Sequence, residues 1–311
     1  MPHNKAVVFA YHTVGVKCLD ALIQGGFSIP LVITQEDSPG ETIWFESVKE
    51  LCLEHQIPFL TETNLADPHL QKTIAEIAPD YIFSFYYRQM IPELILHLAK
   101  IVPLNMHGSL LPHYRGRVPI NWAVLHGETK TGATLHIMEA KPDAGDIVHQ
   151  KNVPILPDET AYEVFLKVAE IAKVNLTEMI PNLLQGNVPR RPNRLQEGSY
   201  FGARKPADGL IDWQWDAQRV YNLVRAVAPP YPGAFTSIHG KQFMIHRAML
   251  ASRPSHSFSQ QLGLQVVDNR IYGFCGDERA LIITKLVLEE QVISPARLQH
   301  ILLDMTQSKN T

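Results

Sequence analysis

The first half of the chain alternates short apolar runs with longer amphipathic stretches. Apolar runs with the length of buried strands lie at residues 6–10, 30–34, 58–60, 81–85 and 102–106. Between them, apolar residues recur at helical spacing near residues 14–25, 42–56, 66–78 and 91–99. This alternation is typical of a parallel sheet covered by helices on both faces, so it predicts an α/β, Rossmann-like domain.

Two of the predicted strands, 81–85 and 102–106, are expected to lie inside this sheet. Open parallel sheets bind ligands beyond the carboxyl ends of their strands, where the loops converge. The segments that follow these two strands are therefore candidate site loops, and they span residues 86–91 and 107–117.

Further extended runs at 132–138 and 147–153 continue the domain. A long helical pattern then runs from Glu159 to about Leu184 and ends at Gly186, because glycine commonly terminates helices.

The stretch that follows is rich in Pro, Arg, Asn and Gly, a composition typical of a linker. We therefore expect a catalytic domain over residues 1–188, a linker over 189–203 and a second domain over 204–311. In the second domain a helical pattern at 217–228 precedes short alternating runs, which predict a small antiparallel, OB-like β-barrel. These runs lie at residues 234–238, 242–248, 263–267, 271–275 and 281–286.

Composition and net charge limit the classes of partner that we expect. The 311 residues are 45% hydrophobic and 19% charged, and the formal net charge of -3 provides no general attraction to phosphates. We therefore expect small-molecule partners, with neither nucleic acid nor membrane insertion, while homo-oligomer formation stays open.

The three cysteines are widely spaced and lack the paired spacing of zinc sites or disulfide frameworks. The histidines likewise lack compact metal-ligand spacing. The N-terminus runs directly into the first predicted strand, and no apolar run approaches the roughly 18 residues typical of a membrane span. These features favour a cytoplasmic protein that uses no metal.

Asn105 and His107 carry the first candidate chemistry. They lie two residues apart, so in an extended conformation both side chains point to the same side. Transfer of an acyl group to an amine needs a base for the amine proton and donors for the oxyanion, which an imidazole and an amide supply. The alternative is that Asn105 caps a turn and His107 is a packed histidine, although the adjacent Gly108 favours a binding loop.

Asp143 lies in a turn-like segment, KPDAGD, between two extended runs. A carboxylate that returned to His107 would favour the charged form of the imidazole. The alternative is an Asx turn, which the neighbouring Pro and Gly favour, and sequence spacing alone does not bring Asp143 to His107. The chain contains neither GxGxxG after the first strand nor GxxxxGK[ST], so the usual nucleotide-cofactor motifs are absent.

Two long segments, HGSLLPHYRGRVPINW and TGATLHIMEAKPDAGDIV, resemble the folate-dependent formyltransferase family. The resemblance extends over most of the chain and weakens after Phe235. VVFAYHTVG, DSPGE and IFSFYYRQMI make it most similar to the formyltransferase portion of the bifunctional polymyxin-resistance enzyme, which modifies UDP-4-amino-4-deoxy-L-arabinose.

The resemblance implies that Asn105 stabilises the transition state, His107 handles the transferred proton and Asp143 favours the charged imidazole. It implies 10-formyltetrahydrofolate as the formyl donor, without a metal. The positions that match the folate contacts of the family are Gln89, Met90, Ile91, Arg117, Glu139, Ala140, Lys141, Pro142 and Asp143. The positions that match the substrate side are Tyr11, Arg204, Lys205 and Arg225.

The cationic residues among them suit a sugar-nucleotide diphosphate, and a role in surface solubility is the alternative. The leading hypothesis is therefore N-formylation of a sugar nucleotide, most closely UDP-4-amino-4-deoxy-L-arabinose or another 4-amino sugar. Methionyl-tRNA formyltransferase is the alternative with the same chemistry, but residues 204–311 hold 12 Lys/Arg against 9 Asp/Glu, a slight excess for tRNA binding. A binding protein that has lost turnover is the third hypothesis, and the intact Asn105, His107 and Asp143 argue against it.

Overall fold

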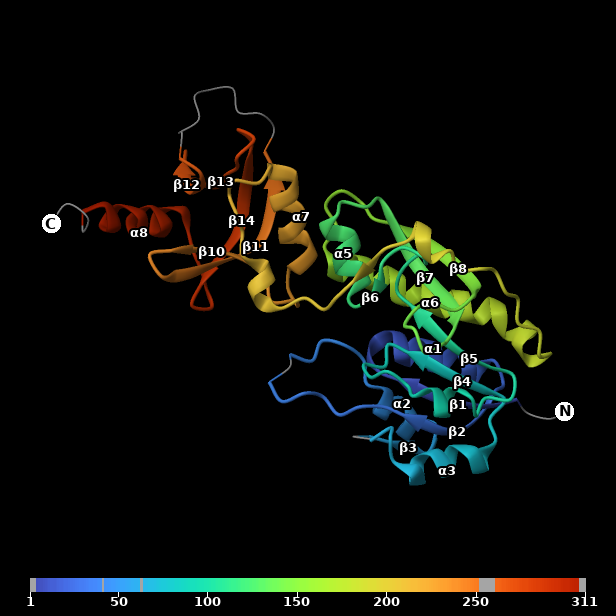
Figure 1. The fold of residues 1–311 in the computed structure, drawn as a ribbon. Coiled ribbons are helices and arrows are strands. Elements are labelled where there is room, and N and C mark those ends of the chain that lie inside the picture. Colours follow the sequence, from blue (N-terminus) through green and yellow to red (C-terminus); the bar gives the residue numbers. More distant parts are fainter. Residues whose placement is uncertain (1–3, 41, 62–63, 252–260, 308–311) are drawn as a thin grey trace. The chain divides into compact units, whose positions relative to one another are not determined.

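The computed structural model describes residues 4–40, 42–61, 64–251 and 261–307. The chain divides into two compact units (Figure 1). Unit 1 comprises residues 1–119, 130–154 and 165–202, and unit 2 comprises residues 120–129, 155–164 and 203–311.

Unit 1 is built on a seven-stranded sheet with the order β3-β2-β1-β4-β5-β7-β8. The first five strands pair in parallel, whereas β7 and β8 are antiparallel additions at one edge. β4 and β5 lie inside the sheet, as predicted. The strands are β1 (Lys5–Ala10), β2 (Ser28–Ile33), β3 (Phe59–Leu60), β4 (Tyr81–Phe85), β5 (Val102–His107), β7 (Lys130–Ile137) and β8 (Ile147–Pro154). This is the Rossmann-like α/β architecture that the sequence predicts.

Helices cover both faces of the sheet. α1 and α6 pack on one face, where the Tyr81 hydroxyl donates to the Leu183 carbonyl at 2.6 Å. α3 and α4 cover the other face, where Ile74 and Ile95 join an apolar cluster with Val7. The helices are α1 (His12–Gln24), α2 (Val48–Glu54), α3 (Pro68–Ile77), α4 (Glu93–Leu96) and α6 (Ala161–Leu184).

Capping residues explain where two of the helices begin. The Ser47 side chain accepts from the Glu50 amide, so α2 begins at Val48, and the prediction of a helix from residue 42 was wrong. Asp67 caps α3 in the same way, with Pro68 at the first helical position.

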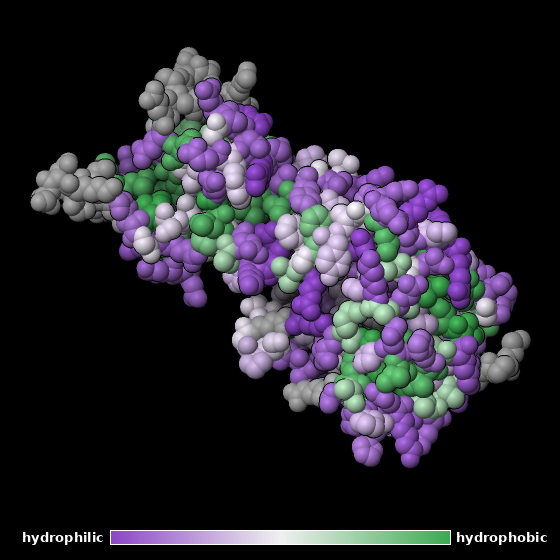
Figure 2. All heavy atoms as spheres, in the orientation of Figure 1, coloured by the Kyte–Doolittle hydropathy of each residue, from purple (hydrophilic) through white to green (hydrophobic). Residues whose placement is uncertain are grey.

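The interior strands explain the apolar runs. All five residues of β4 are buried because helices cover both sides of the sheet, which is why the run is continuous and does not alternate. On the face of the molecule shown in Figure 2, hydrophilic residues cover most of the surface and hydrophobic residues appear in separate patches. No helix in the described part of the chain is long and apolar enough to cross a membrane.

Unit 2 contains an antiparallel half-barrel sheet with the order β10-β11-β14-β13-β12, and β15 pairs with β14. This arrangement is consistent with the predicted OB-like domain. Its strands are β10 (Ala234–Ile238), β11 (Lys241–Leu250), β12 (Gly263–Val267), β13 (Arg270–Phe274), β14 (Ala280–Leu288) and β15 (Gln291–Val292). Its helices are α7 (Ala217–Val227), α8 (Pro295–Gln307) and most of α5 (Pro119–Leu125), with the 3-10 turn η2 (Pro206–Gly209).

The periodicity did not reveal α5, α8, β15 or a two-stranded parallel pair. β6 (Arg115–Gly116) pairs with β9 (Tyr200–Phe201), which follows the 3-10 turn η1 (Leu195–Glu197). Two-residue strands are too short for a periodic signal. The pair matters because it ties the candidate site loop after β5 to the segment that we predicted as a linker.

The hydrogen bond between Tyr81 and Leu183 generates a stability prediction. Tyr81→Phe should lower the free energy of unfolding by about 0.5–1.5 kcal/mol, because a buried hydrogen bond is lost while the Leu183 carbonyl keeps its bond from the Gly186 amide. Urea denaturation measures the change. Tyr200→Phe serves as the control, since that ring is 56% exposed, and an equal loss in both variants would contradict the prediction.

Candidate active site

Strand β5 presents two of the predicted site residues at its carboxyl end. Asn105 and His107 project to the same side of the strand, and His107 is only 7% exposed. β5 pairs in parallel with β4 and antiparallel with β7, so the site lies where the parallel part of the sheet meets its antiparallel edge.

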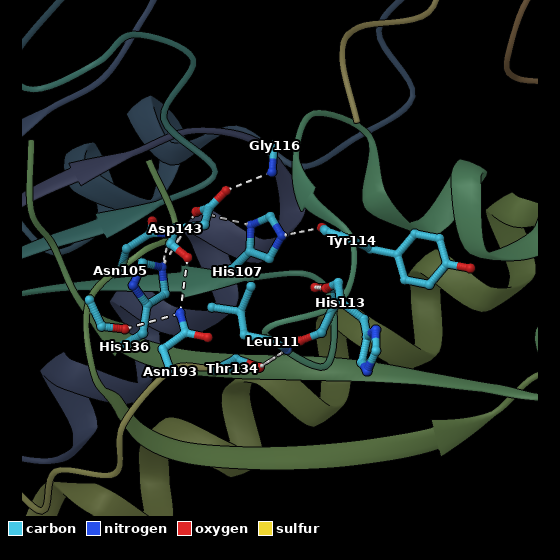
Figure 3. A network of polar contacts seen from close by, with 12 residues as sticks. Asn105, His107, Leu111, His113, Tyr114, Gly116, Thr134, His136, Asp143 and Asn193 are labelled. Atoms are coloured by element: carbon cyan, nitrogen blue, oxygen red, sulfur yellow. Dashed lines mark hydrogen bonds and ion pairs between the residues drawn. The ribbon is translucent and has the colours of Figure 1, made fainter. Parts of the chain in front are cut away.

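Asp143 reaches this point from the turn between β7 and β8. Its Oδ1 lies 3.4 Å from His107 Nδ1, and its Oδ2 accepts a hydrogen bond from the Gly116 amide at 2.8 Å. Figure 3 shows the carboxylate between these two groups. The fold therefore brings together Asn105, His107 and Asp143, which the spacing along the chain did not require.

The second nitrogen of His107 faces a backbone carbonyl. Its Nε2 lies 2.8 Å from the Tyr114 carbonyl oxygen, in the loop that returns after β5. The loop is held in place by Ser109, whose hydroxyl donates to the His113 carbonyl at 2.7 Å. Both nitrogens of His107 are thus in contact with oxygen acceptors, which fixes the plane of the ring.

His136 completes the site, and our sequence analysis did not single it out. Its Nδ1 lies 2.8 Å from the Ile137 carbonyl, which requires a hydrogen on Nδ1 and leaves Nε2 of the neutral ring to accept from Asn105 Nδ2 at 2.9 Å. The same Nε2 lies 3.5 Å from Asp143 Oδ1. The pairing register of β5 and β7 would have identified it, because His136 lies directly opposite Asn105 in this pair of strands.

The surroundings of Asp143 favour its charged form. Burial alone would raise the pKa of this carboxyl, but the charge of His107 and the amide of Gly116 lower it, and His136 adds to this lowering when its ring is protonated. The net result is a pKa well below the ordinary value of an aspartate. Asp143 is therefore a carboxylate near neutral pH.

Gly108 allows close packing next to His107. A Cβ at this position would collide with the hydroxyl group of Tyr86, which follows β4 and has a left-handed φ of 57°. The glycine therefore allows the two predicted site loops to approach each other closely.

The predicted folate contacts lie in unit 1, in the segments that follow β4, β6 and β7. A cavity of about 570 Å³ adjoins the turn after β7, and its lining includes three of the predicted residues. Gln89, Met90 and Arg117 are exposed and outside this lining, whereas Ile91 is buried in the core cluster. The lining residues are Glu93, Leu96, His97, Ala99, Pro103, Met138, Glu139, Ala140 and Lys141.

Of the predicted substrate-side residues, Tyr11 lies in unit 1. Its hydroxyl donates to Asp37 at 2.6 Å, and the Arg88 guanidinium lies 4.6 Å from the centre of its ring. Tyr11 follows β1, so it lies at the same carboxyl edge of the sheet as the catalytic candidates.

The predicted cations Arg204, Lys205 and Arg225 lie in unit 2. Lys205 is exposed, and Arg204 donates to the Asp208 carbonyl at 2.9 Å. Arg225 is only 6% exposed, so the alternative of a role in surface solubility does not fit this residue.

Arg225 binds within its own unit. Its Nη1 donates to the Glu159 carbonyl at 2.8 Å and its Nη2 donates to Asn222 Oδ1 at 2.7 Å. Burial lowers the pKa of the guanidinium, although neighbouring groups oppose the shift. A role for Arg225 at a diphosphate stays a prediction.

The arrangement of unit 1 suits acyl transfer. It offers an amide donor, two imidazoles and a charged carboxylate in one series of contacts, in which His136 lies between Asn105 and Asp143 and Asp143 lies next to His107. Among the described residues, no group of three or more His, Cys, Asp or Glu is placed to hold a metal ion.

Several solved structures share this fold. An N-formyltransferase from Helicobacter canadensis in complex with folinic acid and dTDP-3-aminofucose is 18% identical, with a TM-score of 0.69 over 90% of this chain and 98% of that one. A 4-N formyltransferase from Francisella tularensis is 21% identical, with a TM-score of 0.61 over 77% and 95%. HypX from Aquifex aeolicus in complex with tetrahydrofolic acid is 18% identical, with a TM-score of 0.63 over 96% and 47%.

Two family models match this chain, and their matches include parts of both units. The Formyl transferase model matches residues 4–180, which include Asn105, His107 and Asp143. The model of the formyl transferase C-terminal domain matches residues 204–298. The first of these spans more than half of the chain, and the chain therefore belongs to the formyl transferase family.

Proposed function

We propose that this protein transfers the formyl group of 10-formyltetrahydrofolate to the amine of a sugar nucleotide. The observation that carries the proposal is the contact of Asp143 with both His107 and His136, the second of which accepts a hydrogen bond from Asn105. The Asn105 amide thus lies beside His136, and both imidazoles lie next to the Asp143 carboxylate.

Asn105 is the group proposed to stabilise the oxyanion. Its Nδ2 carries two hydrogens, and His136 accepts one of them. The other hydrogen is directed to the formyl oxygen, where negative charge develops as the amine attacks the carbon. His136 contributes by holding the amide in the orientation that leaves this donor available.

His107 is the group proposed to move the proton. For this step the neutral ring carries its single hydrogen on Nδ1, facing Asp143, and its Nε2 leaves the Tyr114 carbonyl to face the attacking amine. The amine nitrogen bonds to the formyl carbon, His107 takes the amine proton, the bond from that carbon to N10 of the folate breaks, and N10 receives the proton. Asp143 stays charged throughout and stabilises the positive imidazole between the two transfers.

The donor is proposed to bind between the turn after β7 and α4. The cavity there combines apolar walls such as Leu96 and Met138 with the polar backbone of residues 139–141, which suits a flat pterin with donors and acceptors at its edge. The similar structures that contain folinic acid or tetrahydrofolic acid support a folate donor. Gln89, Met90, Ile91, Arg117 and Pro142 stay proposed contacts of the same ligand.

The acceptor is proposed to be UDP-4-amino-4-deoxy-L-arabinose or another nucleotide-linked amino sugar. The resemblance of VVFAYHTVG and IFSFYYRQMI supports the first, and the N-formyltransferase of similar fold in complex with dTDP-3-aminofucose supports the class. Lys205, Arg204 and Tyr11 are the residues proposed to face it. Methionyl-tRNA is the alternative, and the slight cationic excess of residues 204–311 favours the smaller acceptor.

We place the reaction in the cytoplasm. Cys18, Cys52 and Cys275 are all buried and unpaired, which fits a reducing compartment. Burial also raises the pKa of the Cys52 thiol to about 11, so this thiol stays protonated and chemically inert.

Removing the catalytic groups should nearly abolish turnover. We expect His107→Ala to lower kcat roughly 100- to 10,000-fold through loss of proton transfer. Asn105→Ala should lower it about 100- to 1,000-fold through loss of the oxyanion donor. Release of tetrahydrofolate from 10-formyltetrahydrofolate measures both effects, and the exposed His55→Ala is the matched control.

The same assay identifies the acceptor when UDP-4-amino-4-deoxy-L-arabinose, a dTDP-4-amino sugar and methionyl-tRNA are offered separately. Turnover with an amino sugar that requires His107 supports the proposal. Turnover with methionyl-tRNA alone would overturn the choice of acceptor, and no turnover with any of the three would overturn this function.

Acid conditions should reveal the charge of Asp143. Its folded pKa lies below the unfolded value of about 3.9, so its stabilising contribution is complete above that pH and is lost as the pH falls toward the folded value. Asp143→Asn should therefore be less stable than the wild type near pH 7, and the difference should narrow below about pH 4. Urea denaturation at each pH tests this, with Asp268→Asn as the control, and a gap independent of pH would contradict it.

A further inference from the structure

The backbone of Asp143 adopts a left-handed conformation. Its φ is 51°, in the left-handed region that L-residues other than Asn and Asp rarely adopt. Two residues later, a Cβ in place of the hydrogen of Gly145 would collide with the Ile137 carbonyl. The turn is therefore held by its neighbours, and the position of the Asp143 carboxylate depends on them.

Asn193, which lies about 50 residues later in the sequence, binds this turn through its side chain. Its Nδ2 donates to the Asp143 carbonyl at 3.0 Å and to the Gly145 carbonyl at 3.2 Å. Figure 3 shows its amide directed at the Asp143 turn. One side chain thus binds both ends of the three-residue segment that carries the carboxylate.

The backbone on both sides of Asn193 is itself anchored. Before it, Arg191 and Ile147 exchange two backbone hydrogen bonds of 2.8 and 2.9 Å. After it, η1 (Leu195–Glu197) leads into β9, which pairs with β6. Asn193 is therefore a fixed donor, since its own position does not depend on the Asp143 turn alone.

The oxygen atom of the amide group indicates the role of Asn193. Its Oδ1 is buried and has no hydrogen-bond partner among the described residues. The amide cannot be reversed to relieve this, because Oδ1 would then face two carbonyl oxygens. A buried acceptor without a partner lowers stability, so the residue is poorly explained as a stabilising one.

We infer that Asn193 is a positioning residue for the reaction, which holds the Asp143 turn so that the carboxylate meets His107 and His136. The inference rests on the proposed function for its effect on catalysis. Its role requires no contact with either substrate, because it acts on the backbone of Asp143. Loss of Asn193 should therefore affect kcat and leave KM for donor and acceptor nearly unchanged.

Asn193→Ala should lower kcat by up to roughly 100-fold, as expected when a catalytic group shifts by about 1 Å. Asn193→Asp should lower it further, because a carboxylate offers no donor and would repel the two carbonyl oxygens. Asn4→Ala is the matched control, since it removes a similar bond from an amide to the Leu184 carbonyl away from the site. We expect this control to keep the kcat of the wild type.

A double-mutant cycle separates positioning from a general structural role. If Asn193 acts through Asp143, then Asn193→Ala should have almost no further effect on kcat in an Asp143→Ala background. Equal loss in both backgrounds would mean that Asn193 supports the fold in general, and would overturn the inference.

Hydrogen exchange tests the same inference without activity. The Gly116 amide donates to Asp143 Oδ2, so it should lose protection in Asn193→Ala and keep it in Asn4→Ala. Unchanged protection of Gly116 in Asn193→Ala would sink the inference. If the wild type formylates no acceptor but Gly116 loses protection as expected, the proposed function fails while the positioning role stands.

Discussion

The site depends on one buried carboxylate that stays charged. Asp143 is held in this state chiefly by the His107 imidazole and a backbone amide, which offset the cost of burial. Every other group in the site is arranged around it, since His107 lies between this carboxylate and the Tyr114 carbonyl, and His136 links it to Asn105. A negative charge placed in this way is what allows an imidazole to carry positive charge during proton transfer.

Much of the fold could be predicted because the driving force is visible in the sequence. β1 and β4 are buried on both faces, so they appear as continuous apolar runs, and α3 has its capping residue and its proline in the expected order. The short α5 and the two-residue strands β6 and β9 could not be predicted, because a periodic pattern needs more residues than they contain. The antiparallel direction of β7 and β8 was likewise not readable, since direction depends on long-range pairing.

The candidate site likewise contains residues that could be predicted from the sequence and residues that could not. Asn105 and His107 share one strand, so their common side follows from alternation alone. The approach of Asp143 depends on the turn after β7, and its place in the sequence analysis came from a resemblance and not from spacing. His136 and Asn193 were missed because each acts through another residue, and their roles appear only when strand register and the path of residues 189–203 are known.

The pairing of β6 with β9 has a consequence for how the protein can be divided. A fragment ending at residue 188 would contain Asn105, His107 and Asp143, yet it would lack Asn193 and the partner strand of Arg115–Gly116. Unit 1 extends to Gly202 and omits residues 120–129 and 155–164, so no single stretch of chain contains this unit and nothing else. A recombinant chimaera that exchanges residues 203–311 should therefore be joined after Gly202, so that the N-terminal partner brings its own residues 193–201 together with the two shorter segments of unit 2.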